Sequence, residues 1–346
     1  MTLAHLRYAP LLLLAGCATP SLKTVPPSDH FDGTRFFNPD GVQGSSGEQK
    51  QGPIALFRNL VKPPYRTWPK SVPVTPSHPP ARVDGQTMRV TWIGHSTMLV
   101  QTQGLNILTD PLWVQRASPV QFLGVKRVRQ PGVRIADLPR IDLILLSHDH
   151  RDHLDMTAMR RLWHRDRPLI VTGLGTDQIL RRSGIHAVSR DWGGRVALRT
   201  GIDVIVDRAH HWSEYDPGDR NKTLWAGFTV TLPGGNLYFA GDTGPGDMRW
   251  ATEARAAGPV RLAILPIGAY HFAGHETDNH IGPDQAVTAF EQLGAAYAIG
   301  VHWGTFELTA EGIDEPPEHL RSALAREHIE AGRFRTPGAG EAWVIE

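Results

Sequence analysis

The densest group of reactive side chains lies at residues 147–153, which read Ser-His-Asp-His-Arg-Asp-His. Imidazole and carboxylate groups together suit Zn²⁺ and, less selectively, iron or manganese. In an extended segment His148, His150 and Asp152 would alternate onto one side, and a turn into a helix would bring His153 round to join them. These four ligand-type residues within six positions exceed what one tetrahedral zinc ion easily takes. The density of the cluster therefore favours two metal ions.

The alternative interpretation of this cluster is a solvated polar loop. A single histidine after a strand is usually no more than that. Here three histidines and two aspartates directly follow the apolar residues 141–146, which favours a metal site. The end of a strand is also a place where a scaffold can aim several side chains at one point.

The elements that must position this loop begin at residue 87, where strand-like and helix-like stretches start to alternate. Strands are predicted over 88–93, 97–102, 105–109, 141–146, 203–206, 224–232, 236–239, 262–265 and 296–300. Helices are predicted after Asp155 as N-cap, and over 283–293 and 317–327. This mixture of hairpins and strand–helix units predicts an α/β fold, a two-sheet α/β/β/α sandwich.

Composition sets limits on the function of the chain. Its 346 residues carry 36 basic and 35 acidic side chains, a net charge of +1, and 40% are hydrophobic. These values predict a globular protein with a sizeable core and give no reason to expect nucleic acid as a partner. The single cysteine, Cys17, excludes an intramolecular disulfide.

The N-terminus has the character of an export signal. Residues 8–16 form an apolar run that is too short to span a bilayer, which takes about 20 residues, but suits a signal peptide. The run ends in Leu14-Ala15-Gly16-Cys17, which resembles the lipobox of bacterial lipoproteins. The resemblance implies that residues 1–16 are removed and that Cys17 carries lipid; an ordinary signal peptide with an incidental cysteine is the alternative. Ala18, rather than Asp, favours the outer membrane, so we expect a periplasm-facing lipoprotein of the bacterial envelope.

The residues between this signal and the main domain are rich in Pro, Gly and Ser. Such composition predicts a tether over 17–86. Apolar residues such as Phe31, Phe36 and Trp68 are too frequent for a pure linker, so we expect part of this segment to pack on the domain formed by residues 87–346.

The cluster at 148–153 resembles the H-x-H-x-D-H motif of the metallo-β-lactamase fold superfamily. That resemblance implies a fold with two mixed sheets flanked by helices, and three further ligands: His211 before Trp212-Ser213, Asp242 before a Gly-rich turn, and His302 after the last core strand. It implies that one metal ion is held by His148, His150 and His211. The other is held by Asp152, His153 and His302, and Asp242 bridges the two. Asp149 and Arg151 are left as spacers.

A narrower resemblance concerns one branch of this superfamily. Residues 91–97, 108–111, 116–119, 211–213 and 302–306 look like segments of N-acyl-phosphatidylethanolamine-hydrolysing phospholipase D and its bacterial relatives, and 31–39 looks like the N-terminal signature of the bacterial ones. The resemblance implies phosphodiester hydrolysis on a lipid-like substrate. Two Zn²⁺ ions, or Fe or Mn in their place, would share a hydroxide as nucleophile, with the metal ligands Asp152 and Asp242 at the reacting centre.

Several further residues are candidates for supporting roles. By the resemblance, His280 faces the active site and handles substrate or a proton. His95 and Asp110 are expected to contact ligands without binding metal themselves. His210 neighbours His211 and is not chosen as the ligand. His271 and His275 receive no role.

Two other functions remain open on the sequence alone. One is a metallo-hydrolase that acts on a lactone, a β-lactam or a small phosphodiester. The other is a non-catalytic metal-binding lipoprotein of the envelope, which the complete set of seven ligand-type residues disfavours. The substrate is thus a lipid or another small molecule, and the sequence predicts no oligomeric state.

Overall fold

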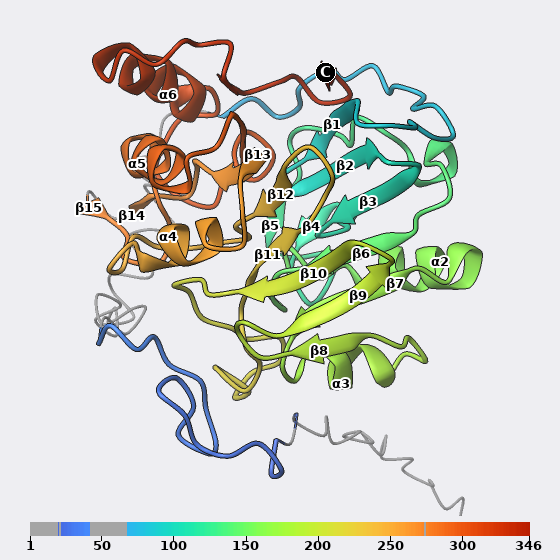
Figure 1. Cartoon of the computed structure of the whole chain (residues 1–346). Helices are drawn as coiled ribbons and strands as arrows, with labels where there is room; N and C mark the ends of the chain where they lie inside the picture. The colour runs from blue at the N-terminus through green and yellow to red at the C-terminus, as the bar shows by residue number, and fades with distance from the viewer. Residues whose placement is uncertain (1–19, 21, 42–67, 273–274) are drawn as a thin grey trace, which may run out of the picture.

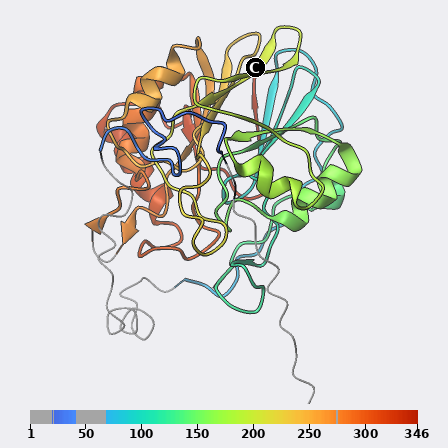
Figure 2. The same ribbon diagram turned by 90° about the horizontal axis from the view of Figure 1, so that it is seen from below.

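The computed structural model describes residues 20, 22–41, 68–272 and 275–346 (Figure 1). Two seven-stranded sheets pack face to face, and helices cover their outer faces (Figures 1 and 2). Cys17 and the signal segment predicted over 1–16 lie outside the described residues. Within the described part of the chain, no helix combines the length and the apolar character needed to cross a membrane.

The first sheet joins antiparallel hairpin strands to a run of parallel ones. Its order is β18-β1-β2-β3-β6-β7-β8, and β3, β6, β7 and β8 are parallel neighbours. The strands are β1 (Met88–Gly94), β2 (Thr97–Thr102), β3 (Leu105–Thr109), β6 (Leu143–Leu146), β7 (Leu169–Gly173), β8 (Val188–Arg190) and β18 (Ala342–Ile345).

The second sheet repeats this mixture. Its order is β17-β16-β13-β12-β11-β10-β9, with parallel pairing from β12 through β13 and β16 to β17. The strands are β9 (Arg195–Arg199), β10 (Ile202–Asp207), β11 (Gly227–Val230), β12 (Asn236–Phe239), β13 (Val260–Pro266), β16 (Tyr297–Val301) and β17 (Phe334–Arg335). Two small hairpins stand apart: β4 (Arg116–Ala117) with β5 (Val125–Lys126), and β14 (His271–Phe272) with β15 (His275–Glu276).

The helices form the two outer layers. They are α2 (Met156–Asp166), α3 (Thr176–Arg181), α4 (Arg249–Arg255), α5 (Pro283–Leu293) and α6 (Glu315–Arg326), with a 3₁₀ turn η1 (Ile135–Asp137). Seen from below, α2 and α3 lie on one side of the sheets and α4, α5 and α6 on the other (Figure 2). This arrangement confirms the predicted α/β/β/α sandwich.

Strand β6 shows why the sequence before the metal-binding loop is uninterruptedly apolar. Leu143 and Leu145 pack in the large cluster that includes the strands of both sheets. Ile144 and Leu146 point the other way and pack with residues of α2 and α3. All four side chains are fully buried, as expected of a parallel strand that is covered on both faces.

Two predicted strands are longer than the observed ones, because residues at their ends bond elsewhere. Strand β6 begins at Leu143 rather than at 141, since the Ile141 amide donates to Asp166 instead of to a neighbouring strand. Strand β11 covers only Gly227–Val230, because the amides of Leu224 and Ala226 donate to the carbonyls of Leu174 and Ser147, which follow β7 and β6 of the first sheet.

The N-terminal residues 22–41 run along the segment between β10 and β11 (208–226). Phe31 and Phe36 are each 1% exposed and pack against Leu224 and Trp225. The imidazole of His30 stacks on Trp192 at 4.4 Å between ring centres. This segment therefore contributes its own small apolar cluster to the fold.

The N-cap of α2 offers a test of how the chain enters this helix. Asp155 accepts hydrogen bonds from the amides of Thr157 and Ala158, and its other oxygen accepts from the Trp113 amide. We expect Asp155→Ala to lower the free energy of unfolding by about 1–2 kcal/mol, measured by urea denaturation. Asp155→Asn should lose less, because its oxygen still caps the helix; equal loss from both variants would contradict this account.

Candidate metal centre

The loop after β6 folds as the sequence predicted, in an extended stretch followed by a turn. The amides of His153 and Leu154 donate to the His150 carbonyl at 3.0 and 2.8 Å, which closes the turn before α2 begins. His148, His150, Asp152 and His153 thereby face one region at the ends of the strands, where His211, Asp242 and His302 also arrive.

Three imidazoles form the first of two clusters. His148 Nε2 lies 2.8 Å from His150 Nδ1, and His211 Nε2 lies 3.3 Å from the same atom. These nitrogens come from the loop after β6 and from the segment after β10. They form the group of three that the superfamily resemblance assigned to one metal ion.

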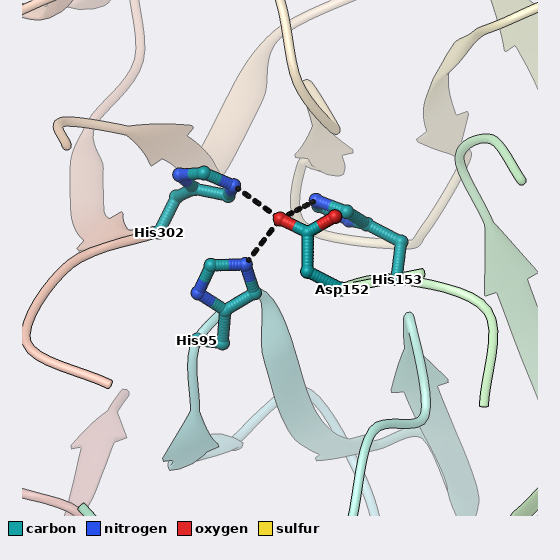
Figure 3. Close-up of side chains that lie close together, drawn as sticks. All are labelled: His95, Asp152, His153 and His302. Atoms are coloured by element: carbon teal, nitrogen blue, oxygen red, sulfur yellow. Dashed lines mark hydrogen bonds and ion pairs between the residues drawn. The ribbon is translucent and has the colours of Figure 1, made fainter. Parts of the chain in front are cut away.

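The second cluster centres on Asp152 (Figure 3). Its Oδ2 lies 3.5 Å from His302 Nε2, 3.7 Å from His153 Nε2 and 3.2 Å from His95 Nε2. His302 follows β16 and His95 follows β1, so both sheets contribute to this group. Asp152, His153 and His302 are the residues that the resemblance assigned to the second ion.

Asp242 lies between the two clusters. Its Oδ2 is 3.0 Å from His153 Nε2 and 3.1 Å from His302 Nε2, and 3.9 Å from both His148 Nε2 and His211 Nε2. No other carboxylate oxygen among the described residues of the site is recorded within 4 Å of both groups. This position fits a carboxylate that bridges two ions.

The backbone at Gly241 allows Asp242 to reach this position. Gly241 has a φ of +62°, and a Cβ there would lie 2.5 Å from the Cβ of Ser147. Glycine therefore permits both the left-handed backbone and the close approach of the β12 end to the β6 end.

The donor atoms fit resident metal ions. Tetrahedral zinc with Zn–N bonds of about 2.0–2.1 Å separates its ligand nitrogens by about 3.3 Å, close to the spacings in the first cluster. Asp242 Oδ1 is buried with no hydrogen-bond partner, which is costly in a protein interior unless something else satisfies such an atom. The residues thus suit two divalent cations.

The two clusters differ in their charge. Burial and the neighbouring imidazoles hold the pKa of His148 and of His211 well below the usual range, so these rings are neutral and offer lone pairs. Burial alone would lower the pKa of His302, but Asp242 and Asp152 raise it to about 9. Burial alone would raise the pKa of Asp242, but His153 and His302 hold it well below its usual range. In the metal-free protein the second cluster therefore keeps protons that a metal ion would displace.

A buried carboxylate supports ligands from both clusters. Asp110 Oδ2 accepts from His153 Nδ1 at 2.7 Å, as the sequence suggested, and from the Ser147 hydroxyl at 2.6 Å. Ser147 Oγ lies 2.8 Å from His148 Nδ1. His153 and His148 thus turn their Nε2 atoms toward the metal region, with Asp110 behind them. His211 is oriented in a similar way, because its Nδ1 lies 2.9 Å from the Asn279 carbonyl oxygen.

Of the remaining histidines, some lie at the metal centre and others do not. His280 Nδ1 lies 3.8 Å from Asp242 Oδ2, within the site. His95 contacts Asp152, consistent with a supporting role, although its nitrogen also lies within reach of the second cluster. His210 Nδ1 lies 2.7 Å from Asp40 Oδ2, so this ring points to the N-terminal segment. His271 lies outside every ligand group found among the described residues, and the side chain of His275 is not among the described ones.

Three contacts of the site were missed from the sequence. Ser147 joins Asp110 to His148. Asp149, left as a spacer, accepts from the Thr223 hydroxyl at 2.7 Å. Arg151, also left as a spacer, donates to the Tyr215 carbonyl at 2.8 and 3.0 Å. Both spacers tie the metal-binding loop to residues 213–223. The polar character of Asp149 and Arg151, which alternate with the ligands, could have indicated such contacts. Their partners could not be identified, because they lie more than 60 residues away in the sequence.

Comparison with known proteins agrees with this geometry. A family model described as "Beta-lactamase superfamily domain" matches residues 105–303. N-acyl-phosphatidylethanolamine-hydrolyzing phospholipase D 1 of Caenorhabditis elegans is 36% identical over 266 residues, 73% of this chain and 74% of the relative. A metal-dependent hydrolase of Pyrobaculum islandicum is 27% identical and covers 68% of this chain and 92% of its own length. The structure of a metallo hydrolase from Ignicoccus hospitalis has a TM-score of 0.56 at 23% identity, over 75% of this chain and 99% of that one.

The fold and site define a metal-dependent hydrolase. The chain belongs to the beta-lactamase superfamily, in agreement with the resemblance of the 148–153 motif.

The role of Asp110 can be tested by metal affinity. We expect Asp110→Asn to weaken zinc binding about 10–100-fold, because a neutral amide no longer fixes His153 and Ser147. Competition with a zinc-sensitive chelator measures the affinity. Asp84→Asn, an exposed carboxylate ahead of β1, serves as the control. Equal zinc affinity in the two folded variants would remove this role from Asp110.

The adjacent histidines 210 and 211 give a sharper contrast. His211→Ala should lose at least one metal ion per chain, since its Nε2 belongs to the first cluster. His210→Ala should retain the metal content of the parent protein, because its ring faces Asp40. Elemental analysis after dialysis against metal-free buffer measures both, and the reverse pattern would show that the ligand is His210.

Proposed function

We propose that this chain is a binuclear zinc hydrolase of phospholipase D type, which cleaves the phosphodiester bond of lipids resembling N-acyl-phosphatidylethanolamine. The observation that carries the proposal is the 36% identity, across 73% of the chain, with a relative named for hydrolysis of that lipid. The convergence of all seven ligand-type side chains in two joined clusters supports the hydrolytic part.

The side chains divide the work of the site. His148, His150 and His211 would hold one zinc ion, and Asp152, His153 and His302 the other, with Asp242 shared. When bound, two such ions lower the pKa of a water molecule between them and polarise the phosphoryl oxygen under attack. Asp110 keeps His153 in the required orientation throughout.

We place Asp152 and His280 on the substrate side of the site, because both side chains are partly exposed. The side chain of each is 17% exposed, whereas those of His148, His153, His211 and His302 are at most 1% exposed. Burial lowers the pKa of His280 to about 4, so its ring is neutral near pH 7. A neutral imidazole can donate a hydrogen bond to the substrate or accept a proton from the attacking water. We assign His280 this part.

We also propose that a lipid on Cys17 holds the enzyme at the periplasmic side of the outer membrane. The sequence Leu14-Ala15-Gly16-Cys17 supports this location. An anchored enzyme would meet a bilayer substrate without having to diffuse to it.

Turnover of a defined lipid tests the proposed function. Zinc-loaded protein incubated with N-acyl-phosphatidylethanolamine in mixed micelles should release phosphatidic acid and N-acylethanolamine, detected by mass spectrometry. His150→Ala should reduce the rate by at least about 100-fold, in the range found when a catalytic electrostatic group is removed. His210→Ala should retain the parent rate. Absence of turnover above the His150→Ala level would exclude this substrate, and hydrolysis of a lactone or β-lactam by the same sample would identify another branch of the superfamily.

A further inference from the structure

The hairpin of β4 and β5 carries an apolar tip in solvent. Phe122 is 83% exposed, Leu123 66% and Val120 38%; the other exposed large hydrophobic side chain among the described residues is Val344, at 44% on β18. In Figure 2 this hairpin, drawn in teal, extends away from the sheets at the lower edge of the view. Adjacent exposed aromatic and aliphatic side chains on a projecting loop usually mark an interaction site.

The polar groups of the hairpin turn inward while the apolar ones turn outward. The Gln121 amide donates to the carbonyls of Arg116 and Ser118 at 3.1 and 3.4 Å, and its oxygen accepts from the Arg116 amide. Arg116 also donates to the Gly124 carbonyl. The hairpin thus satisfies its own polar groups and presents an apolar end, the reverse of the usual distribution in water.

The base of the hairpin is fixed to the metal centre. Arg127 is 1% exposed and donates to the carbonyls of Leu112 and Val114 at 3.0 and 2.9 Å. Its guanidinium lies 4.8 Å from the centre of the Phe306 ring, and that ring lies edge-on to His95 at 5.3 Å. A contact at the tip is therefore held in a fixed relation to the second metal cluster.

The sequence around the hairpin is basic throughout. Residues 111–136 contain Arg116, Lys126, Arg127, Arg129 and Arg134 and no acidic residue. Lys126, directly beside the tip, is exposed. Cations beside inserted apolar side chains suit a surface of anionic phosphate groups.

We propose that the 119–124 tip inserts into the interfacial region of a phospholipid bilayer, with Lys126 and Arg116 at the level of anionic headgroups. Three apolar side chains at the end of a hairpin are too few for a stable protein interface, which buries about 800 Å² on each partner. They suffice for shallow insertion in which the aromatic ring of Phe122 and the side chain of Leu123 leave water. The biological role of this contact rests on the proposed function, because insertion would present headgroups of the bilayer to Asp152 and His280. The contact itself requires no catalysis.

A site-specific fluorophore tests insertion directly. Cys17 is the sole cysteine, so the full chain with Cys17→Ser accepts one new cysteine and cannot be lipidated. Phe122→Cys and the control Val344→Cys are each labelled with an environment-sensitive dye. With vesicles of phosphatidylethanolamine and phosphatidylglycerol, the dye at 122 should shift to the blue and the dye at 344 should not. No shift at 122 overturns the proposal. A shift at 122 that rises with protein concentration in the absence of vesicles also overturns it, in favour of a contact between copies of the chain.

Binding and turnover are then separated in the same background. Phe122→Ser with Leu123→Ser should reduce co-sedimentation with these vesicles by about 10-fold or more, and Val344→Ser should not. Hydrolysis of a short-chain, monomeric phosphodiester lipid should be unchanged in both. Parent-like binding by the double variant sinks the insertion proposal, whether or not the enzyme cleaves lipid. Insertion without lipid cleavage would instead sink the proposed function and leave this inference standing.

Discussion

The site depends on one buried charge, the carboxylate of Asp110. It is wholly enclosed at the end of β3, where its backbone adopts a positive φ of 31°, and it accepts hydrogen bonds from the Ser147 amide, the Ser147 hydroxyl and His153. Burial raises its pKa above the usual value, while the bonds from His153 and Ser147 act in the opposite direction. The same group therefore joins the ends of two neighbouring parallel strands and turns two imidazoles outward. Movement of Asp110 would misplace ligands of both clusters.

The site around this carboxylate brings together buried imidazole and carboxylate groups, which is costly in a protein interior. The imidazoles of His148, His153, His211 and His302 are buried together with the carboxylate of Asp242, and Asp242 Oδ1 has no hydrogen-bond partner. His95 and His302 also adopt positive φ angles of 54° and 63°, which cost free energy for residues other than glycine. Burial of the two-sheet core, with fully buried strands such as β6 and β13, offsets the free-energy cost of this site. Closely spaced donor atoms that are held by rigid strands are what a preorganised metal site requires.

The sequence was most informative where the chemistry is local. The grouping of His148, His150, Asp152 and His153 could be predicted from spacing alone, since one turn brings them together. His211, Asp242 and His302 needed a family resemblance, because pairings between distant strands place them. Short strands such as β7 and β18 were not foreseen, since runs of four or five apolar residues are ambiguous without their partners. The partners of Asp149 and Arg151 could not be predicted from the sequence either, because only the tertiary structure brings loop 213–223 close to them.

The contacts of the N-terminal segment bear on the order in which parts of the protein fold. The Asn38 side chain donates to the His211 carbonyl at 3.0 Å, and Asp40 receives His210, across separations of 173 and 170 residues. Contacts between such distant residues close large loops, which costs chain entropy and slows folding. Residues 38–40 thus bind to the loop that carries His210 and His211. We expect residues 38–40 to dock after the two sheets have formed and to fix the loop that carries His210 and His211.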